Sequence, residues 1–252
     1  MVGERRFGGL ARLYGEAATR RIAAGHVCVV GIGGVGSWAA EALARSAVGT
    51  LTLIDLDHIA ESNTNRQIHA LEGEYGRAKV QAMASRILAI NPACRVQAIE
   101  DFVTADNVAA LLPRCDLVLD AIDEVRAKAA LLAHCRAAGI AVISTGGAGG
   151  RRDPTQITVN DLSRTTHDAL AAKLRARLRK EYGFPRDPKQ AFGIACVYST
   201  EAVVRPDGLA CDVDAAGLHG LNCAGYGSAV TVTASFGLIA AARALDTLAL
   251  AS

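Results

Sequence analysis

Residues Val27–Ser37 read VCVVGIGGVGS, a run of apolar residues followed by glycines at positions 31, 33, 34 and 36. The apolar run predicts a buried β-strand, and the glycines predict a tight turn that opens into a helix. Free N–H groups at such a helix N-terminus attract negative charge, and a turn without side chains lets an anion approach the backbone. The stretch therefore predicts a nucleotide-phosphate site with contacts from Gly31, Gly33, Gly34 and Gly36.

A second apolar strand ends at Asp55, about 20 residues beyond the glycines, which is the spacing expected of an acid that binds ribose. A nicotinamide-dependent dehydrogenase or a non-catalytic nucleotide sensor would show the same two features. The next polar residues favour phosphate displacement, because cations and amides neutralise the charge of a leaving pyrophosphate. They are Asp57, Asn63, Asn65, Arg66, Gln67 and Lys79.

A further acid follows the apolar run 117–119, within the string Asp120-Ala121-Ile122-Asp123. The carboxyl ends of parallel strands face the ligand crevice of an open sheet. Carboxylate oxygens are also the ligands that Mg²⁺ prefers. Asp123 is therefore expected to hold a magnesium ion on a nucleotide triphosphate.

The chain alternates between strand and helix patterns, which predicts an α/β fold with a doubly wound, mostly parallel, Rossmann-like sheet. Its length of 252 residues and its hydrophobic content of 51% suit a single domain, 1–252. Residues 1–160 form the expected nucleotide-binding half, and 161–252 form an extended half expected to contact substrate or a second copy. Strands are expected at 26–31, 50–55, 95–99, 117–121, 140–144 and 156–160, and helices at 36–47, 76–90, 105–112 and 125–138.

The order of these motifs resembles the adenylating domain of the ubiquitin-activating-enzyme superfamily, which includes bacterial enzymes of molybdopterin and thiamine biosynthesis. The resemblance implies that ATP and Mg²⁺ are bound and that a carboxylate attacks the α-phosphate to give an acyl-adenylate and pyrophosphate. It also implies ribose binding by Asp55 and magnesium on Asp123. The phosphate contacts that it implies come from Asn63, Arg66 and Lys79. The residues expected to be catalytic are Arg66, Lys79 and Asp123.

Other stretches resemble one branch of that superfamily, the tRNA threonylcarbamoyladenosine dehydratases. In the reaction that this resemblance implies, ATP activates the threonyl carboxylate of the modified adenosine at tRNA position 37, and the carbamoyl group of the same side chain displaces AMP. A tethered nucleophile has a high effective concentration, so no covalent protein intermediate is needed. The alternative is adenylation of the C-terminus of a ubiquitin-like sulfur-carrier protein. The stretches are Arg6–Gly9, Asn65–Leu71, Ser144–Gly150, Asp153–Ile157 and Ser199–Glu201.

The chain has seven cysteines but no Cys-x-x-Cys pair, so the tetrathiolate zinc site of the molybdopterin branch is not expected. Cys28 and Cys115 fall on or beside apolar runs and are expected in the core. A thioester or persulfide role, with a sulfur-transfer partner, stays open for Cys196 and Cys223. The odd count without framework spacing or a signal peptide predicts a reducing cytoplasm.

Residues 151–190 carry ten Lys or Arg against five Asp or Glu. Between Asp168 and Tyr182 the leucines at 170, 174 and 178 share one seam of a predicted helix, which leaves cations along both edges. Such a helix suits the phosphodiester backbone of tRNA, and a solvated face with ion pairs is the alternative.

Three smaller features leave two interpretations each. Ser144-Thr145-Gly146-Gly147 ends a strand, so its backbone is expected to bind substrate or a monovalent cation, unless the glycines serve packing. His69 either shuttles a proton or packs beside a helix. The molybdopterin-type enzymes place an N-terminal arginine in the ATP site of the partner in a homodimer. That position here is Gly9, and Arg6 or Arg12 either substitutes for it or lies on a surface helix.

The stretch 229–250 is apolar, but Arg243 and Asp246 interrupt it before the roughly 20 residues that a bilayer requires. We therefore expect a buried or dimer-packing helix rather than a transmembrane one. Peripheral membrane association stays open.

Overall fold

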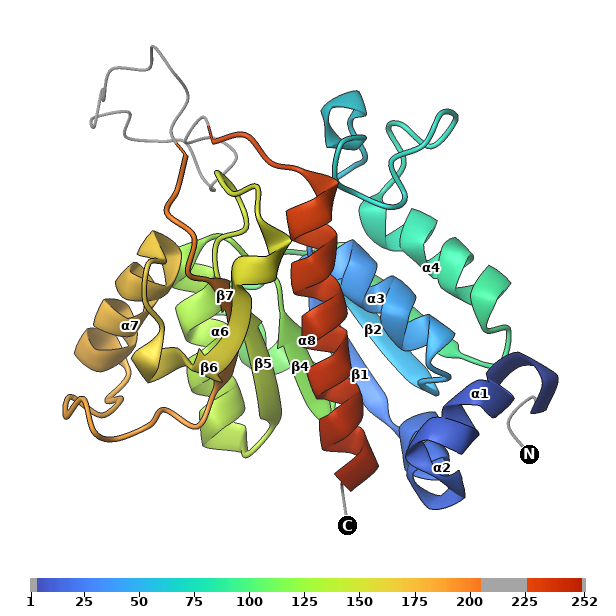
Figure 1. Cartoon of the computed structure of the whole chain (residues 1–252), viewed down its shortest axis with the longest axis horizontal. Coiled ribbons are helices and arrows are strands. Elements are labelled where there is room, and N and C mark those ends of the chain that lie inside the picture. The colour runs from blue at the N-terminus through green and yellow to red at the C-terminus, as the bar shows by residue number, and fades with distance from the viewer. Residues whose placement is uncertain (1–3, 205–225, 251–252) are drawn as a thin grey trace.

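The computed structural model describes residues 4–204 and 226–250 (Figure 1). Its centre is a seven-stranded sheet in the order β3-β2-β1-β4-β5-β7-β6, in which the chain winds outward from β1 in both directions. This arrangement confirms the doubly wound α/β fold. The strands are β1 His26–Val30, β2 Thr50–Ile54, β3 Arg95–Ile99, β4 Leu117–Asp120, β5 Ala141–Thr145, β6 Ile157–Asp161 and β7 Ala195–Ser199.

Helices cover both faces of the sheet. Figure 1 shows α3, α4 and α8 in front of the strands, with α6 behind them. A large apolar core lies under α3 and α8. One smaller cluster lies under α5 and α6, and another lies between α6 and α7. The helices are α1 Glu4–Tyr14, α2 Glu16–Ala24, α3 Gly36–Arg45, α4 Lys79–Ile90, α5 Val108–Leu111, α6 Val125–Ala138, α7 Ala169–Glu181 and α8 Val230–Leu250.

The strand register brings the ends of the central strands level. Val30 of β1 pairs with both Ile54 of β2 and Asp120 of β4, and Asp120 pairs with Ser144 of β5. The residues that follow these strands therefore meet at one edge of the sheet. The chain reverses its winding direction between β1 and β4, which is where open α/β sheets form a ligand crevice.

The last two strands form the antiparallel part of the mostly parallel sheet. The strand expected at 156–160 forms at Ile157–Asp161, but it runs antiparallel to β7, which the sequence patterns did not reveal. Alternate residues of β6 are exposed, as is common for an antiparallel edge strand with one solvated face. The buried strand β7 is only five residues long and carries no alternation that marks it.

Helix α8 packs along α3 as a buried helix, in agreement with the interpretation of 229–250. Phe236, Ala240 and Ala244 have no exposed surface. A Cβ on Gly237 would lie 2.4 Å from the carbonyl oxygen of Val35, so the two helices approach closely. By length and composition α8 is the one helix among the described residues that could cross a membrane, yet 56% of its apolar window is buried in the fold.

Candidate functional site

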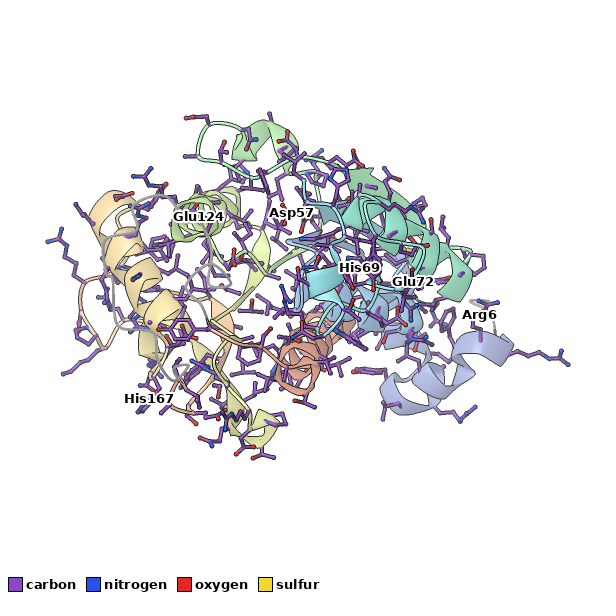
Figure 2. The ribbon with its side chains drawn as sticks, turned by 90° about the horizontal axis from the view of Figure 1, so that it is seen from above. Arg6, Asp57, His69, Glu72, Glu124 and His167 are labelled. Atoms are coloured by element: carbon purple, nitrogen blue, oxygen red, sulfur yellow. The ribbon has the colours of Figure 1, made fainter. Side chains whose placement is uncertain are left out.

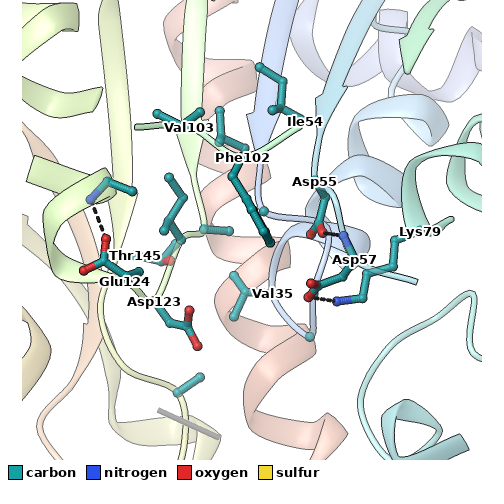
Figure 3. Close-up of a pocket in the computed structure, with 18 of the residues that line it drawn as sticks. Val35, Ile54, Asp55, Asp57, Lys79, Phe102, Val103, Asp123, Glu124 and Thr145 are labelled. Carbon is teal, nitrogen blue, oxygen red and sulfur yellow. Dashed lines mark hydrogen bonds and ion pairs between the residues drawn. The ribbon is translucent and has the colours of Figure 1, made fainter. Parts of the chain in front are cut away.

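A cavity of about 710 Å³ opens at the carboxyl edge of β1, β2 and β4. Figure 3 shows Asp55, Asp57 and Lys79 on one side of it and Asp123 and Thr145 on the other. The cavity has the size of a nucleotide-binding pocket. Its lining includes nine of the residues selected from the sequence: Gly31, Gly33, Gly34, Asp55, Asp57, Arg66, Gln67, Lys79 and Asp123.

The glycines of the turn after β1 serve two purposes. Gly31 has φ +88°, and a Cβ there would lie 2.8 Å from the carbonyl oxygen of Ala121. A Cβ on Gly36 would come within 1.8 Å of the carbonyl oxygen of Gly31, so only glycine lets α3 begin this close to the strand. A Cβ on Gly33 would meet no atom within 4 Å, because this residue faces the open cavity. Gly31 and Gly36 shape the turn, and Gly33 leaves room for an anion.

Asp55 ties the glycine turn to the end of β2. One carboxylate oxygen accepts a hydrogen bond from the Ile32 N–H at 2.6 Å, and the other accepts one from the Asp57 N–H at 2.8 Å. Burial raises the pKa of Asp55, against the opposing effect of the Lys79 charge and of these two hydrogen bonds. The carboxylate therefore fixes the turn as well as facing the cavity.

Lys79 is the first residue of α4 and brings a cation to the same side. Its Nζ lies 2.6 Å from Asp57 Oδ2, and its side chain is 7% exposed against 56% for that of Asp57. The Lys79 N–H donates to the Asp57 carbonyl at 3.0 Å. These two bonds direct the ammonium group into the cavity from a buried stem.

Arg66 lies at the rim beside the glycine turn. Its Nη1 donates to the Ser62 carbonyl and to Asn65 Oδ1, both at 2.8 Å. Trp38 Nε1 donates to the Arg66 carbonyl at 2.9 Å, which fixes the backbone against α3. The guanidinium is partly exposed and can turn toward an anion in the cavity.

Asp123 lies on the loop between β4 and α6, and a buried ion pair holds that loop. Lys128 Nζ is 2.7 Å from Asp120 Oδ2, and both side chains are at most 1% exposed. The same Nζ donates to the Ile122 carbonyl at 2.9 Å. Lys128 therefore fixes the residue next to Asp123, and Figure 3 shows the Asp123 carboxylate facing the middle of the cavity.

Three predicted binding residues do not line the cavity. Gly36 lies beneath the turn, and Asn63 caps its own loop by accepting the Ala60 N–H at 3.0 Å. Asn65 donates to the Ser228 carbonyl at 2.8 Å and accepts from Arg66. A sequence motif gives the order of residues, but the capping contacts that occupy Asn63 and Asn65 become visible only in the folded loop.

Two further lining segments were not among the predicted nucleotide-binding residues, although the turn Ser144–Gly147 was expected to bind substrate or a monovalent cation. Asp101–Thr104 follows β3, and Thr145–Gly149 without Gly147 follows β5. The Phe102 side chain projects into the cavity (Figure 3), although the residue is 51% exposed. Both segments come directly after predicted strands. Their position at the carboxyl ends of these strands could therefore have identified them as lining residues.

Other candidate groups lie away from the cavity lining. In the view of Figure 2, His69 lies between Asp57 and Arg6 of α1. The residue is 3% exposed, with no hydrogen-bond partner for either ring nitrogen among the described residues. Burial, with Lys79 and Arg86 nearby, lowers the pKa of His69 to about 4, so its ring is neutral at pH 7. Arg6 donates to the Ile90 carbonyl, and Arg12 is exposed.

The cysteines that the structure describes are buried or half-buried and free. Cys28 has no exposed surface and Cys115 packs at the edge of the same cluster, in agreement with their expected core positions. Burial raises the pKa of the Cys196 thiol to about 12, so the thiolate that a nucleophilic role needs is disfavoured. Cys223 lies outside the described residues.

The fold, the glycine turn and the facing cations and acids define a nucleotide-binding α/β protein, and the chain belongs to the ThiF family, whose model matches residues 7–251. It is 55% identical over 246 residues to the tRNA threonylcarbamoyladenosine dehydratase of Escherichia coli K12, covering 95% of this chain and 92% of that protein. The solved structure of the E. coli dehydratase in complex with ATP matches with a TM-score of 0.88 and 52% identity, over 97% of this chain and 94% of that one.

A more distant relative represents the alternative activity. The molybdopterin-synthase adenylyltransferase of E. coli K12 is 37% identical over 118 residues, which is 47% of each chain. Only this shorter part is shared, whereas the likeness to the dehydratase runs over nearly the whole chain.

Proposed function

We propose that the protein is an ATP-dependent dehydratase that cyclises threonylcarbamoyladenosine at position 37 of tRNA. The observation that carries the proposal is the facing of Lys79 and Asp123 across a nucleotide-sized cavity beside the glycine turn. The whole-chain likeness to dehydratases supports this substrate in preference to a sulfur-carrier protein.

The first step is attack of the threonyl carboxylate on the α-phosphorus of ATP, with cleavage of the bond to the β-phosphate. Backbone N–H groups of the turn 31–36 hold the phosphates. Lys79 and Arg66 neutralise the charge that develops on the leaving pyrophosphate. Asp55 binds the ribose, and the hydrogen bond that it accepts from the Ile32 N–H keeps the turn in position.

A magnesium ion fits the donor set, because the Asp123 carboxylate is exposed in the cavity and supplies a hard oxygen ligand. When bound with ATP, Mg²⁺ supplies charge neutralisation at the phosphates. Lys128 donates to the Ile122 carbonyl, which holds the backbone next to Asp123 in place.

In the second step the carbamoyl group attacks the acyl carbon and the bond to AMP breaks. The carboxylate oxygen leaves with AMP and the carbamoyl group gives up a proton, so the nucleoside loses the elements of one water. Because the nucleophile is part of the substrate itself, the reaction needs no nucleophile from the protein. The raised pKa of the Cys196 thiol is consistent with the absence of a protein nucleophile.

The proposal also covers the tRNA contact, the oligomeric state, the cell compartment and a cation site. Helix α7 supplies the tRNA contact, since Lys173 and Lys180 are exposed while Leu170, Leu174 and Leu178 are buried. The protein acts as a cytoplasmic homodimer, and the turn after β5 is the candidate site for a monovalent cation. No described residue specifically favours a sulfur-transfer partner.

The test is mass spectrometry of nucleosides from tRNA that bears threonylcarbamoyladenosine, after incubation with the protein and ATP. We expect an ATP-dependent loss of one water with the wild type, and none with Lys79→Ala or Asp123→Ala. Arg77→Ala is the matched control, because Arg77 is exposed and lies outside the cavity lining. An unchanged nucleoside, together with ATP–pyrophosphate exchange that requires a ubiquitin-like carrier, would assign the alternative activity.

A further inference from the structure

One buried carboxylate connects the wall of the cavity to the basic helix. Asp168, which is 5% exposed, is the N-cap of α7: its Oδ1 accepts the Ala171 N–H at 2.9 Å. Its Oδ2 accepts the Gly147 N–H, also at 2.9 Å. Gly147 belongs to the turn 146–149 after β5, of which the other three residues line the cavity. The two oxygens of one side chain therefore hold the first turn of α7 and the cavity wall together.

The contact between Asp168 and the turn 146–149 leaves no room for a side chain on Gly146. A Cβ on Gly146 would lie 2.1 Å from Asp168 Oδ2 and 3.2 Å from the Cβ of Tyr198. The turn therefore rests directly on the carboxylate, and a shift of Asp168 must shift the turn.

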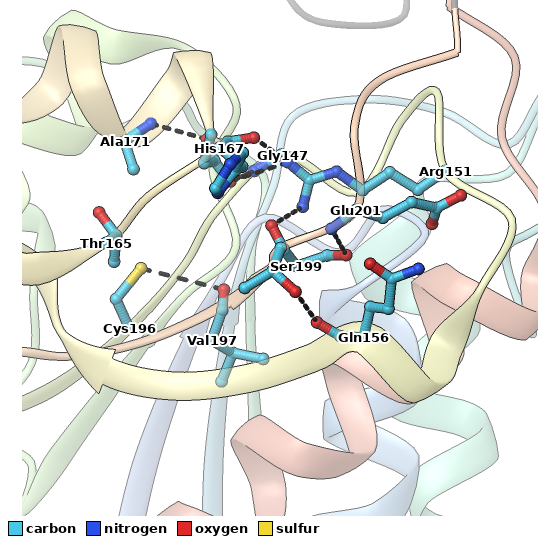
Figure 4. Close-up of polar contacts among 12 residues, drawn as sticks. Gly147, Arg151, Gln156, Thr165, His167, Ala171, Cys196, Val197, Ser199 and Glu201 are labelled. Carbon is cyan, nitrogen blue, oxygen red and sulfur yellow. Dashed lines mark hydrogen bonds and ion pairs between the residues drawn. The ribbon is translucent and has the colours of Figure 1, made fainter.

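Arg151 holds the same carboxylate from the other side. Its Nη2 is 3.6 Å from Asp168 Oδ2, and both side chains are 1% exposed. Its Nη1 donates to the Ser199 carbonyl and its Nη2 to the His167 carbonyl, both at 3.0 Å (Figure 4). His167 has φ +55°, an uncommon conformation for a residue with a side chain, which these contacts maintain.

Helix α7 can transmit a displacement because it is one rigid element between Asp168 and the exposed cations. Its leucine seam packs on α6 and on the aromatic pair Phe184–Phe192. Lys173 and Lys180 face solvent. A displacement of α7 by a polyanion bound to these cations would reach the turn 146–149 through the Asp168 contact.

We propose that Asp168 is a positioning residue that couples RNA bound on α7 to the geometry of the nucleotide cavity. This inference rests on the proposed function, since it takes ATP and tRNA as the two ligands. The two sites are energetically linked through the Gly147–Asp168 contact. Linkage requires that each ligand changes the affinity of the other by the same factor.

The experiment is calorimetric titration of ATP into the full chain, with and without saturating unmodified tRNA transcript, which lacks the reactive carboxylate. In the wild type we expect the transcript to change the ATP dissociation constant at least about fivefold. In Asp168→Asn we expect that factor to fall to about 1 while ATP still binds, because asparagine keeps a helix cap but loses the charge and one of the two acceptors.

Asp161→Asn is the matched control. Asp161 is also a capping carboxylate, which accepts the Ser163, Phe192 and Gly193 N–H groups at 2.8–2.9 Å, but it does not touch the cavity lining. We expect this variant to keep the wild-type coupling factor. Equal coupling in wild type and Asp168→Asn, or equal loss in both variants, would overturn the proposal.

Hydrogen exchange in the wild type tests the same idea without a substitution that could unfold the chain. Addition of the transcript should change the exchange of peptides that cover 144–151, and not of peptides that cover α4. An unchanged 144–151 segment with RNA bound would overturn the coupling. Failure of the wild type to bind ATP at all would instead overturn the proposed function, and this inference with it.

Discussion

Lys79 and Asp57 form an ion pair in which the cation is buried and the carboxylate is exposed. The 2.6 Å contact joins a lysine side chain that is 7% exposed to an aspartate side chain that is 56% exposed. The pair therefore holds the Lys79 ammonium at the cavity, while the Asp57 carboxylate stays in contact with water. A nucleotide phosphate can replace Asp57 as the partner of Lys79 at little cost, since the displaced carboxylate already faces water.

Replacement of Lys79 by alanine is expected to lower the rate of the proposed reaction by at least about 100-fold, as loss of one transition-state charge contact does elsewhere. The fold should persist, because Asp57 is exposed and is not left as a buried unpaired charge. Single-turnover product formation and thermal melting together check this. A variant that melts like the wild type and keeps its rate would exclude Lys79 from the phosphate site.

Alanine at Gly36 is expected to destabilise the fold, whereas alanine at Gly33 is expected to leave its stability nearly unchanged. The new Cβ at 36 would lie 1.8 Å from the Gly31 carbonyl oxygen, whereas that at 33 would meet nothing within 4 Å. Gly36→Ala should lower the unfolding free energy by about 3 kcal/mol, and Gly33→Ala should change it by less than about 0.5 kcal/mol.

Urea unfolding of the two glycine variants measures the difference. ATP titration then separates packing from binding, because a methyl group at 33 stands where a phosphate would approach. A stable Gly33→Ala variant with wild-type ATP affinity would show that the phosphates do not lie on this part of the turn.

Acid should destabilise the protein through His69. Its pKa of about 4 lies below the ordinary value of 6.5, so between these values the unfolded chain binds a proton that the folded one does not. This contribution to stability is complete above pH 6.5 and is lost as the pH falls toward 4. It amounts to about 3 kcal/mol at most.

Urea unfolding at pH 7 and pH 4.5 measures the loss. His69→Gln should show a smaller decline than the wild type, because glutamine does not titrate. His58→Gln is the control, since His58 is exposed and its replacement should leave the decline intact. An equal decline in all three proteins would show that His69 does not control acid stability.

Charge reversal on α7 should weaken RNA binding without loss of stability. Lys173 and Lys180 are exposed, so Lys173→Glu with Lys180→Glu leaves the leucine seam intact. The tRNA dissociation constant should rise about tenfold or more, and the dependence of log Kd on log salt should become shallower by about 1–2. Fluorescence titration at several salt concentrations measures both.

Arg114→Glu is the control for α7, because Arg114 is exposed and lies in the loop before the amino end of β4, outside α7. We expect it to leave the salt dependence unchanged. The α7 variant reverses two charges and the control reverses one, so a control that weakens binding by half as much in log Kd would indicate a general effect of net charge instead of a binding face.

Local patterns were sufficient to predict six of the seven strands, the positions of the helices that alternate with them, and nine of the residues that line the carboxyl edge, but not β7. Apolar runs that end at Gly31, Asp55 and Asp120 are local signals, and parallel pairing in register brings such ends together without further information. The seam of Leu170, Leu174 and Leu178 was likewise readable from helical spacing and is buried as expected.

Which polar side chains are available to a ligand became clear from the folded chain and not from the motif. Asn63 and Asn65 belong to the recognised motif, yet both are engaged by nearby backbone or side-chain groups. The antiparallel direction of β6 and the contact between Asp168 and Gly147 also depend on segments brought together from 21 or more residues apart. Hydrogen bonds are satisfied by whichever donor lies within about 3 Å in the folded chain, and sequence patterns do not contain that distance.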